Sequence, residues 1–142
     1  MSAAENKRLM QHVFGELAKG ESGPYIDILD EDFTFTITGR NPWSRTIRGK
    51  EAVRRELYRP LFEQFADRYT TQLVNIVAEG DMVVIEHRGC VTTKKGKVYS
   101  NEYCLVCRMA DGKLKSLKEY ADSYHVEQVL DPPPWARTVE PA

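Results

Sequence analysis

Three consecutive strand-like segments in the second half of the chain constrain its fold most strongly. Residues 82–93, 97–109 and 113–126 are rich in Val, Ile, Leu, Tyr and Cys, and the turn signals Lys95-Gly96 and Asp111-Gly112 separate them. Consecutive strands that are joined by short turns pair antiparallel. Because each segment is longer than an ordinary strand, we expect the three to form the curved main sheet of one domain.

The remainder of the chain predicts helices packed on that sheet. Apolar periodicity and turn residues predict helices at 6–19, 24–29 and 50–65, and strands at 33–38 and 69–79. Pro60 lies inside the third helix, so we expect a kink or break near Tyr58 and Arg59. Helices followed by a long antiparallel meander indicate an α+β domain with its helices on one face of a bent sheet.

Length and composition limit the number of domains, the kinds of partner and the location that we expect for this protein. A chain of 142 residues suits one domain, and we place it at 1–130, with a proline-rich tail at 131–142 that Trp135 anchors to its own domain or to a second subunit. The 20 basic and 21 acidic residues form no basic stripe, so we expect no nucleic-acid partner. We expect no membrane association either, because no apolar run is long enough to span a bilayer. The three cysteines and the polar N-terminus favour a cytoplasmic location.

Charged side chains fall among apolar ones on the predicted sheet. We expect Thr93 to pair with Val98 across the first turn and Ala110 with Leu114 across the second. Side-chain alternation then places the following residues on one, mainly apolar face: Glu86, Arg88, Asn101, Tyr103, Leu105, Leu117 and Glu119. Unpaired buried charge is costly, so charged groups on such a face need a reason. We therefore predict an apolar cavity with these two glutamates and the arginine as its polar cluster, and we place His87, His125 and Asp122 on the opposite face.

Three segments carry a resemblance to a known family: DFTF at 32–35, IRGKEAV at 47–53, and the final strand with its Asp-Gly turn and Lys-Glu-Tyr-Ala-Asp at 118–122. Over roughly residues 6–130 the chain resembles the SnoaL-like branch of the nuclear transport factor 2-like superfamily, which includes ketosteroid isomerase, polyketide cyclases and limonene epoxide hydrolase. The resemblance implies an NTF2-like (cystatin-like) cone, in which three helices pack on a strongly curved, mixed, mostly antiparallel sheet around a deep pocket. It also implies a homodimer.

The resemblance transfers unevenly to individual residues. Glu119 falls where the polyketide cyclases and the epoxide hydrolase carry an active-site aspartate. Glu86 and Arg88 look like the Arg-x-Asp pair of the epoxide hydrolase with its charges exchanged. Phe35 and Ile37 stand where that enzyme holds its attacking water, so its hydrolysis scheme does not transfer. The catalytic positions of ketosteroid isomerase carry apolar residues in this sequence.

Two hypotheses for function stay open. In the first, the protein is an enzyme without metal or other cofactor, in which Glu119 is a general acid or base, Arg88 stabilises an enolate and Glu86 holds Arg88. Its substrate is a small hydrophobic carbonyl compound, and the expected substrate-binding residues are Tyr103, Asn101, Trp43, Leu105, Leu117, Phe35 and Ile37. In the second, the charged residues form a structural ion-pair network in a non-catalytic small-molecule-binding, protein-interaction or dimerisation domain.

Overall fold

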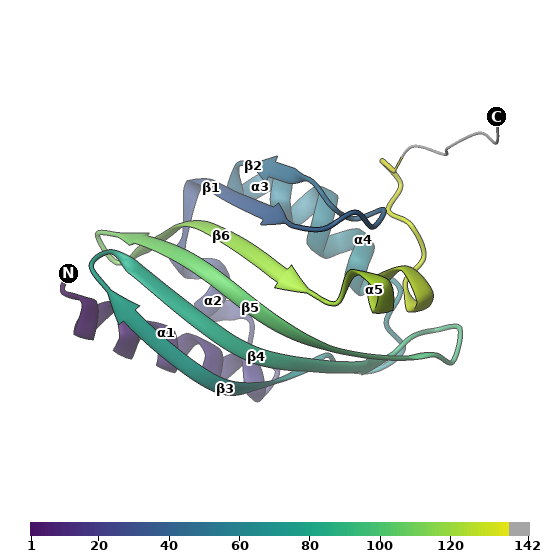
Figure 1. Ribbon diagram of the computed structural model, residues 1–142, viewed down its shortest axis with the longest axis horizontal. Coiled ribbons are helices and arrows are strands. Elements are labelled where there is room, and N and C mark those ends of the chain that lie inside the picture. Colours follow the sequence, from purple (N-terminus) through teal and green to yellow (C-terminus); the bar gives the residue numbers. More distant parts are fainter. Residues whose placement is uncertain (137–142) are drawn as a thin grey trace.

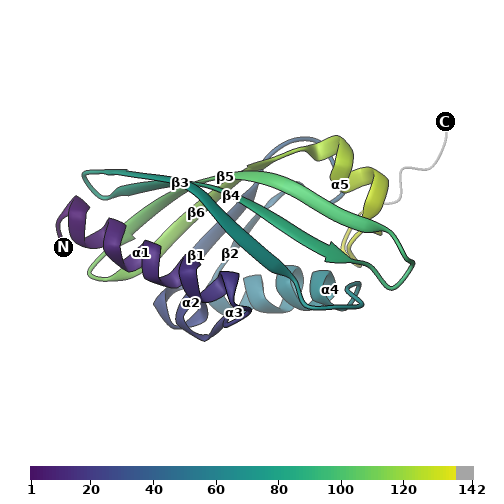
Figure 2. The ribbon, with the colours of Figure 1, turned by 90° about the horizontal axis from the view of Figure 1, so that it is seen from below.

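A six-stranded mixed sheet bends over a layer of helices in this protein (Figure 1), whose computed structural model describes residues 1–136. The elements in chain order are α1 (Ala3–Ala18), α2 (Gly23–Ile28), β1 (Leu29–Ile37), β2 (Thr46–Arg48), α3 (Lys50–Val53), the π-helical turn η1 (Arg54–Tyr58), α4 (Arg59–Phe62), β3 (Thr70–Glu79), β4 (Met82–Thr92), β5 (Val98–Ala110), β6 (Lys113–Ala121) and α5 (Ser123–Val129). The strand order is β2-β1-β6-β5-β4-β3, with β1 and β6 parallel and all other neighbours antiparallel. Figure 2 shows α1 to α4 along one side of the sheet. The predicted α+β architecture is confirmed.

Helix α1 is positioned by a capping box and an apolar stripe. Ser2 accepts a hydrogen bond from the Glu5 amide, and the Glu5 carboxylate accepts one from the Ser2 amide, so two otherwise free donors are satisfied. Met10, Val13 and Phe14 recur at helical spacing and are buried against the sheet. This stripe covers the part of the sheet that contains β3 and β4.

Pro60 makes the third helical segment irregular. Proline has no backbone N–H, so the Glu56 carbonyl loses its usual partner four residues ahead. The Arg59 amide donates to the Arg54 carbonyl five residues back, which defines a π-helical turn, and the Trp135 indole N–H donates to the Glu56 carbonyl at 2.8 Å. The predicted irregularity near Tyr58 is therefore confirmed, and the C-terminal segment supplies the donor that the helix lacks.

The C-terminal segment packs on the domain as far as it is described. Trp135 lies edge-to-face on Trp43 at 6.0 Å between ring centroids, and the Arg45 guanidinium lies 4.4 Å from the Trp135 ring centroid. The Asp131 amide and carbonyl both bond to the Gln64 side chain. Trp135 thus anchors the segment to its own domain. This is one of the two anchors that the sequence predicted for the proline-rich tail, and residues 137–142 of that tail lie outside the described residues.

The first hairpin has a register one residue away from the predicted one. Thr92, and not Thr93, pairs with Val98, and a short loop with Gly96 at φ 81° closes the turn. Because side chains alternate along a strand, this slip turns every β4 side chain to the other face. Ile85 and His87 point inward, whereas Glu86 and Arg88 point outward.

The second hairpin contains a bulge that the sequence analysis did not anticipate. Asp111 and Gly112 both have positive φ (52° and 74°), as a two-residue type I′ turn requires, and Ala110 pairs with Lys113 instead of Leu114. Lys115 is then left without a partner, because Met109 pairs with Leu114 and Arg108 with Ser116. Beyond this bulge Leu105 pairs with Glu119 as predicted.

Two further elements differ from the prediction. Strand β6 ends at Ala121, and the segment that was predicted to continue it forms α5. Asp122 explains the change, because its carboxylate accepts hydrogen bonds from the Tyr124 and His125 amides and so begins a helix. Strand β2, which lies where no helix or strand was predicted, pairs antiparallel with β1.

Gly89 is expected to be intolerant of a side chain because Tyr69 lies directly over it. A β-carbon at position 89 would overlap the Tyr69 hydroxyl group. We expect Gly89→Ala to lower the free energy of unfolding by roughly 1–3 kcal/mol in urea titrations, since the buried tyrosine would have to move. Gly15→Ala in α1, where a β-carbon meets nothing within 4 Å, should instead raise stability by about 0.5–1 kcal/mol. Equal effects of the two substitutions would contradict this account.

Candidate active site

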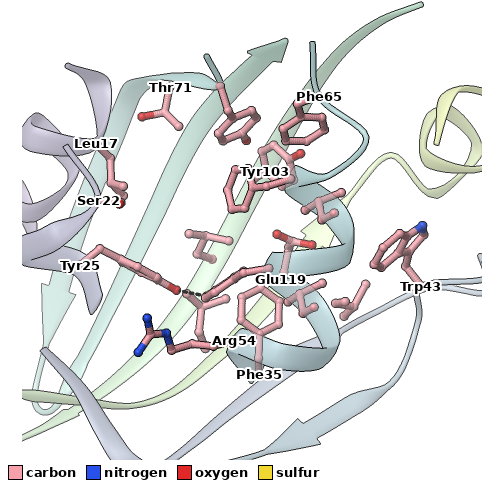
Figure 3. A pocket seen from close by; sticks show the side chains of 18 of the residues that line it. Leu17, Ser22, Tyr25, Phe35, Trp43, Arg54, Phe65, Thr71, Tyr103 and Glu119 are labelled. Atoms are coloured by element: carbon pink, nitrogen blue, oxygen red, sulfur yellow. Dashed lines mark hydrogen bonds between the residues drawn. The ribbon is translucent and has the colours of Figure 1, made fainter. Parts of the chain in front are cut away.

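A cavity of about 640 Å³ lies between the concave face of the sheet and the helices (Figure 3). This volume is in the range of small-molecule sites. Most of its wall is aliphatic or aromatic, and five of the seven tyrosines in the chain line it: Tyr25, Tyr58, Tyr69, Tyr99 and Tyr103. The cavity thus combines an apolar surface with several hydroxyl groups.

Glu119 projects from β6 into this cavity (Figure 3). Its two direct neighbours across the sheet are Ile37 on β1 and Leu105 on β5, both apolar and buried. The backbone on the β1 side is held by Thr38, whose amide and hydroxyl donate to the Glu119 carbonyl at 3.1 and 2.7 Å. The sheet therefore fixes a carboxyl group among hydrocarbon neighbours.

Burial raises the pKa of the Glu119 carboxyl from its ordinary value of 4.5 to about 7. By surface area Glu119 is only half-buried, because its carboxyl faces the hollow and not other protein atoms. The surrounding protein nevertheless removes much of the hydration that would stabilise the anion. Within residues 1–136 no donor hydrogen-bonds to this carboxyl and no cation pairs with it. Glu119 can therefore exchange a proton with a bound molecule near neutral pH.

Tyr99 is the acceptor at the end of a hydroxyl network. Its oxygen accepts hydrogen bonds from the Tyr103 hydroxyl at 2.8 Å and from Asn101 Nδ2 at 3.1 Å. The ring stacks on His125 at 5.4 Å between centroids, and His125 Nε2 in turn accepts from the Ser100 amide at 3.1 Å. Because both neighbours donate to Tyr99, its own hydroxyl proton remains available to a ligand.

A second pair of hydroxyl groups lies on the helical side of the cavity. The hydroxyl groups of Tyr25 on α2 and Tyr58 on η1 are 2.5 Å apart (Figure 3). Burial raises the pKa of both phenols, and that of Tyr58 rises well above its usual range. Hydrogen bonds from Tyr103 and Asn101 oppose the same effect at Tyr99, where the pKa reaches about 12. The hydrogen bonds that Tyr99 accepts therefore offset part of the effect of burial on its pKa.

His87 is a buried, uncharged part of the wall. Its ring stacks on Tyr103 at 4.8 Å and meets the edge of Phe14 at 5.4 Å between centroids. Burial lowers the pKa of this histidine from 6.5 to about 4, so the imidazole is neutral at physiological pH. The prediction that His87 lies on the outer face is wrong, because the first hairpin pairs one residue away from the predicted register.

The structure brings most of the predicted substrate-binding residues together. The predicted residues that line the cavity, together with Glu119, are Tyr103, Leu105, Leu117, Phe35, Ile37 and Trp43. Asn101 is buried but is absent from the wall, and its amide group bonds to Tyr99 and to the backbone of Glu102 and Asp122. Asn101 therefore positions Tyr99 and does not face the cavity.

Glu86 and Arg88 do not belong to the cavity, and the predicted cluster of three charged residues is wrong. Arg88 pairs across the outer face of the sheet with Glu102 at 3.2 Å, and more than half of each side chain is exposed. Glu86 accepts a hydrogen bond from Asn75 at 3.4 Å on the same outer face. Solvated pairs of this kind contribute about 0–1 kcal/mol to stability. The alternation of Ile85 and His87 with the charged residues Glu86 and Arg88 is the signal that could have revealed this orientation.

Other cavity residues were not predicted as site residues at all. Tyr25, Tyr58, Tyr69 and Tyr99 come from four separate elements or loops, and nothing in their spacing indicates that their hydroxyl groups converge. Their only signal is that tyrosine, when buried, needs a hydrogen-bond partner.

The cavity opens near the helices. The exposed residues among those that line it include Ser22, Arg54, Arg59 and Phe62, and Figure 3 shows Ser22 and Arg54 on the side of Tyr25. Within residues 1–136 no group of three His, Cys, Asp or Glu side chains is placed to hold a metal ion. None of the helices of this part of the chain is long and apolar enough to cross a membrane.

Comparison with known proteins identifies the family. Residues 10–117 match the SnoaL-like domain. This chain belongs to the SnoaL-like domain family. The match covers most of the protein and agrees with the curved sheet, the helical layer and the enclosed cavity described above. A comparison of this chain with curated protein sequences finds no match.

Solved structures share the fold at low sequence identity. An NTF2-like protein from Burkholderia thailandensis E264 has 21% identity and a TM-score of 0.76, with 89% of this chain and 98% of that chain covered. A protein proposed to be a SnoaL-like polyketide cyclase, from Jannaschia sp. CCS1, has 19% identity and a TM-score of 0.74, with 93% and 95% covered. A protein proposed to be an isomerase, from Bacillus subtilis, has 16% identity and a TM-score of 0.73, with 91% and 95% covered. These likenesses establish the NTF2-like fold of the SnoaL-like domain.

The raised pKa of Glu119 predicts a pH-dependent stability. Between pH 4.5 and about 7 the folded state holds a proton on this carboxyl that the unfolded chain has released, so stability falls as the pH rises through this window. The loss is on the order of 3 kcal/mol by pH 8. Glu119→Gln removes this effect, so the variant should gain stability over the wild type as the pH rises from 4.5 to 8 in urea titrations.

The comparison with the Glu119→Gln variant is needed because His87 changes the stability with pH in the opposite direction. Its lowered pKa means that the unfolded chain binds the extra proton between pH 4 and 6.5, so this group makes stability rise with pH. The wild-type curve alone therefore mixes two effects. A difference between Glu119→Gln and wild type that does not change with pH would contradict the burial of Glu119.

Proposed function

We propose that this SnoaL-like domain is an enzyme that moves a proton on a small hydrophobic carbonyl compound bound in the cavity, with Glu119 as the general acid–base. The observation that carries the proposal is one carboxyl group, without a partner in the described residues, at the wall of an apolar, ligand-sized cavity. A purely structural buried carboxyl would be expected to have hydrogen-bond donors around it, because desolvation without compensation is costly. The chemistry needs no cofactor.

Glu119 is suited to take a proton from a carbon next to a carbonyl group. In the proposed step the C–H bond breaks, the proton passes to the carboxylate, and the electron pair forms the enolate with its negative charge on oxygen. A base with a pKa of about 7 is partly ionised at neutral pH and stronger than an exposed carboxylate. Return of the proton to another carbon gives an isomer, and attack of the enolate on a second carbonyl closes a ring.

Tyr99 is the proposed donor to the developing enolate oxygen. Its hydroxyl is held by Tyr103 and Asn101, both of which donate to it, and by the stack on His125. A donor that is fixed before the reaction stabilises new charge without reorganisation. Asn101 and Tyr103 would then act as positioning residues for Tyr99.

Two fold neighbours are consistent with this reaction class. One is named as a proposed polyketide cyclase and another as a proposed isomerase. Cyclisation of a polyketide and isomerisation of a ketone can both begin with the removal of a proton next to a carbonyl. At under 25% identity these names support the class of chemistry for this chain and indicate no substrate.

Glu119→Gln is expected to abolish proton exchange. With 2-tetralone in D2O, the wild type should accelerate the exchange of the protons next to the carbonyl, as followed by proton NMR. The rate should increase with pH around an apparent pKa of about 7, because the ionised carboxylate is the base. Glu119→Gln should lose this acceleration and remain folded, since glutamine has nearly the same shape.

Glu86→Gln provides the matched control for this experiment. Glu86 is a carboxylate on the same sheet that faces outward, so its replacement should leave the exchange rate unchanged. Exchange by Glu119→Gln at the wild-type rate would overturn the assignment. Binding of 2-tetralone without exchange in the wild type would favour a non-catalytic binding domain.

The tyrosine network predicts a graded loss of activity. Tyr99→Phe removes the proposed donor and should lower the exchange rate by roughly 10²–10³-fold. Tyr103→Phe removes only one of the groups that hold Tyr99, so its effect should be smaller. Tyr120→Phe, on the exposed outer face, should have no effect. A loss in Tyr103→Phe that exceeds the loss in Tyr99→Phe would move the donor role to Tyr103.

A further inference from the structure

Two arginines lie at the mouth of the cavity. Arg54 on η1 and Arg59 at the start of α4 both line the cavity, and both are exposed to solvent. In the described part of the chain no other Lys or Arg lines it. Figure 3 shows the Arg54 side chain on the side of Tyr25. The positive charge of this cavity is therefore confined to its opening, where a ligand can reach it.

The π-helical turn brings these two arginines to one opening. In an α-helix the neighbours on the surface are three or four residues apart, so residues five apart point in different directions. In this protein the Arg59 amide donates to the Arg54 carbonyl, so one wider turn closes over five residues. Arg59 thus follows Arg54 along the helix axis, and both side chains reach the cavity. Turns of this kind are frequent at functional sites.

Neither arginine at the mouth has an acidic partner in the described part of the chain. Arg45 and Arg55, which do not line the cavity, both pair with Glu56, at 3.4 and 3.8 Å. None of the ion pairs includes Arg54 or Arg59. Like charges that are neighbours on a helix repel each other. The arrangement is therefore slightly unfavourable in the free protein and suited to an anion.

Glu63 limits the charge that the mouth can accept. It is exposed, lines the cavity and lies four residues after Arg59, without an ion pair to it in the described part of the chain. Two arginines and one glutamate leave one net positive charge at the mouth. A carboxylate carries one negative charge, whereas a phosphate monoester carries about 1.5 to 2 near neutral pH. Guanidinium groups also match the two oxygens of a carboxylate. The mouth therefore favours a carboxylate.

The wall becomes apolar directly behind the arginines. Phe62 is 47% exposed and lines the cavity, and its ring lies 6.4 Å from that of Tyr58 and 5.3 Å from that of Phe65 between centroids. Tyr58 belongs to the same π-helical turn as Arg54. A molecule that is held at the mouth by a charged end would thus place a hydrocarbon body against these rings.

We propose that Arg54 and Arg59 bind a carboxylate at the solvent end of the substrate. The substrate class is then a hydrophobic keto acid, with its carbonyl near Glu119 and its carboxylate at the mouth. This inference deepens the proposed function and rests on it for the position of the carbonyl. Binding of the carboxylate itself does not depend on proton transfer. A carboxylate at the mouth keeps much of its hydration, so its binding avoids most of the cost of burying a charge.

The test compares keto acids of three lengths with their carboxamides by calorimetric titration at neutral pH. The acids are 4-acetylbenzoate, 3-(4-acetylphenyl)propanoate and 5-(4-acetylphenyl)pentanoate, and each amide has nearly the same shape without the charge. For at least one length the wild type should bind the acid roughly five- to tenfold more tightly, the gain expected from two solvent-exposed charge pairs. The preference should decrease as the NaCl concentration rises, because salt screens exposed charges.

Variants of one helical segment test the two arginines against a general effect of charge. Arg54→Gln and Arg59→Gln should each lower the preference for the acid, and the double variant should abolish it. Glu63→Gln should increase the preference, because it removes the negative charge from the mouth. Arg55→Gln is the matched control and should retain the preference, since Arg55 pairs with Glu56 and does not line the cavity. All four substituted side chains are exposed, so the variants should fold.

The outcomes separate this inference from the proposed function. Three results would each overturn the carboxylate site: equal affinities for acid and amide at every length, no measurable binding of any of the acids, or a preference that persists in the double variant of Arg54 and Arg59. Glu119→Gln should retain the preference while it loses proton exchange. Exchange without the preference refutes only the carboxylate site, and the preference without exchange refutes only the catalytic role of Glu119.

Discussion

One extra residue in β6 determines where the carboxyl group of this protein lies. Without the bulge at Lys115, the register that begins at the Asp111-Gly112 turn would continue and turn Glu119 toward water. With the bulge, Glu119 lies between Ile37 and Leu105 and faces the cavity. An ordinary surface glutamate thereby becomes a desolvated acid. The raised pKa of Glu119 and its contact with the cavity both follow from this change of face.

The helical layer and the C-terminal segment complete the enclosure. Pro60 deprives the helix of one hydrogen bond at the Glu56 carbonyl, and the π-helical turn that precedes it places Tyr58 against the cavity. Trp135 supplies the missing donor and covers Trp43, which is buried at the cavity wall. A local defect in the helix is thus compensated by a residue 79 positions away. This compensation ties the C-terminal segment to the integrity of the pocket.

The polar groups of the cavity fall into two kinds. Tyr99 and Asn101 are connected to each other and to the backbone, and such connected networks hold their members in one arrangement. The Glu119 carboxyl has no such connection within residues 1–136 and faces the cavity. Folding alone gains nothing from this position, since the carboxyl loses hydration without compensation. Its presence is understandable if a bound molecule supplies the partner.

The sequence by itself determined the main helices and strands, the two hairpins and the irregular helix at Pro60, because each depends on local patterns. It also predicted Glu119 on the inner face, but only because the assumed pairing of Ala110 with Leu114 has the same register that the bulge at Lys115 restores further along β6. It did not determine which way β4 faces, because a loop one residue shorter than assumed reverses the side chains, and Glu86 and Arg88 consequently left the predicted site. Only the tertiary structure brought the tyrosine hydroxyl groups and His87 together, since residues far apart in sequence meet only once the sheet has curved over the helices. Periodicity gives the face of a strand relative to its neighbours, whereas register and curvature decide what that face encloses.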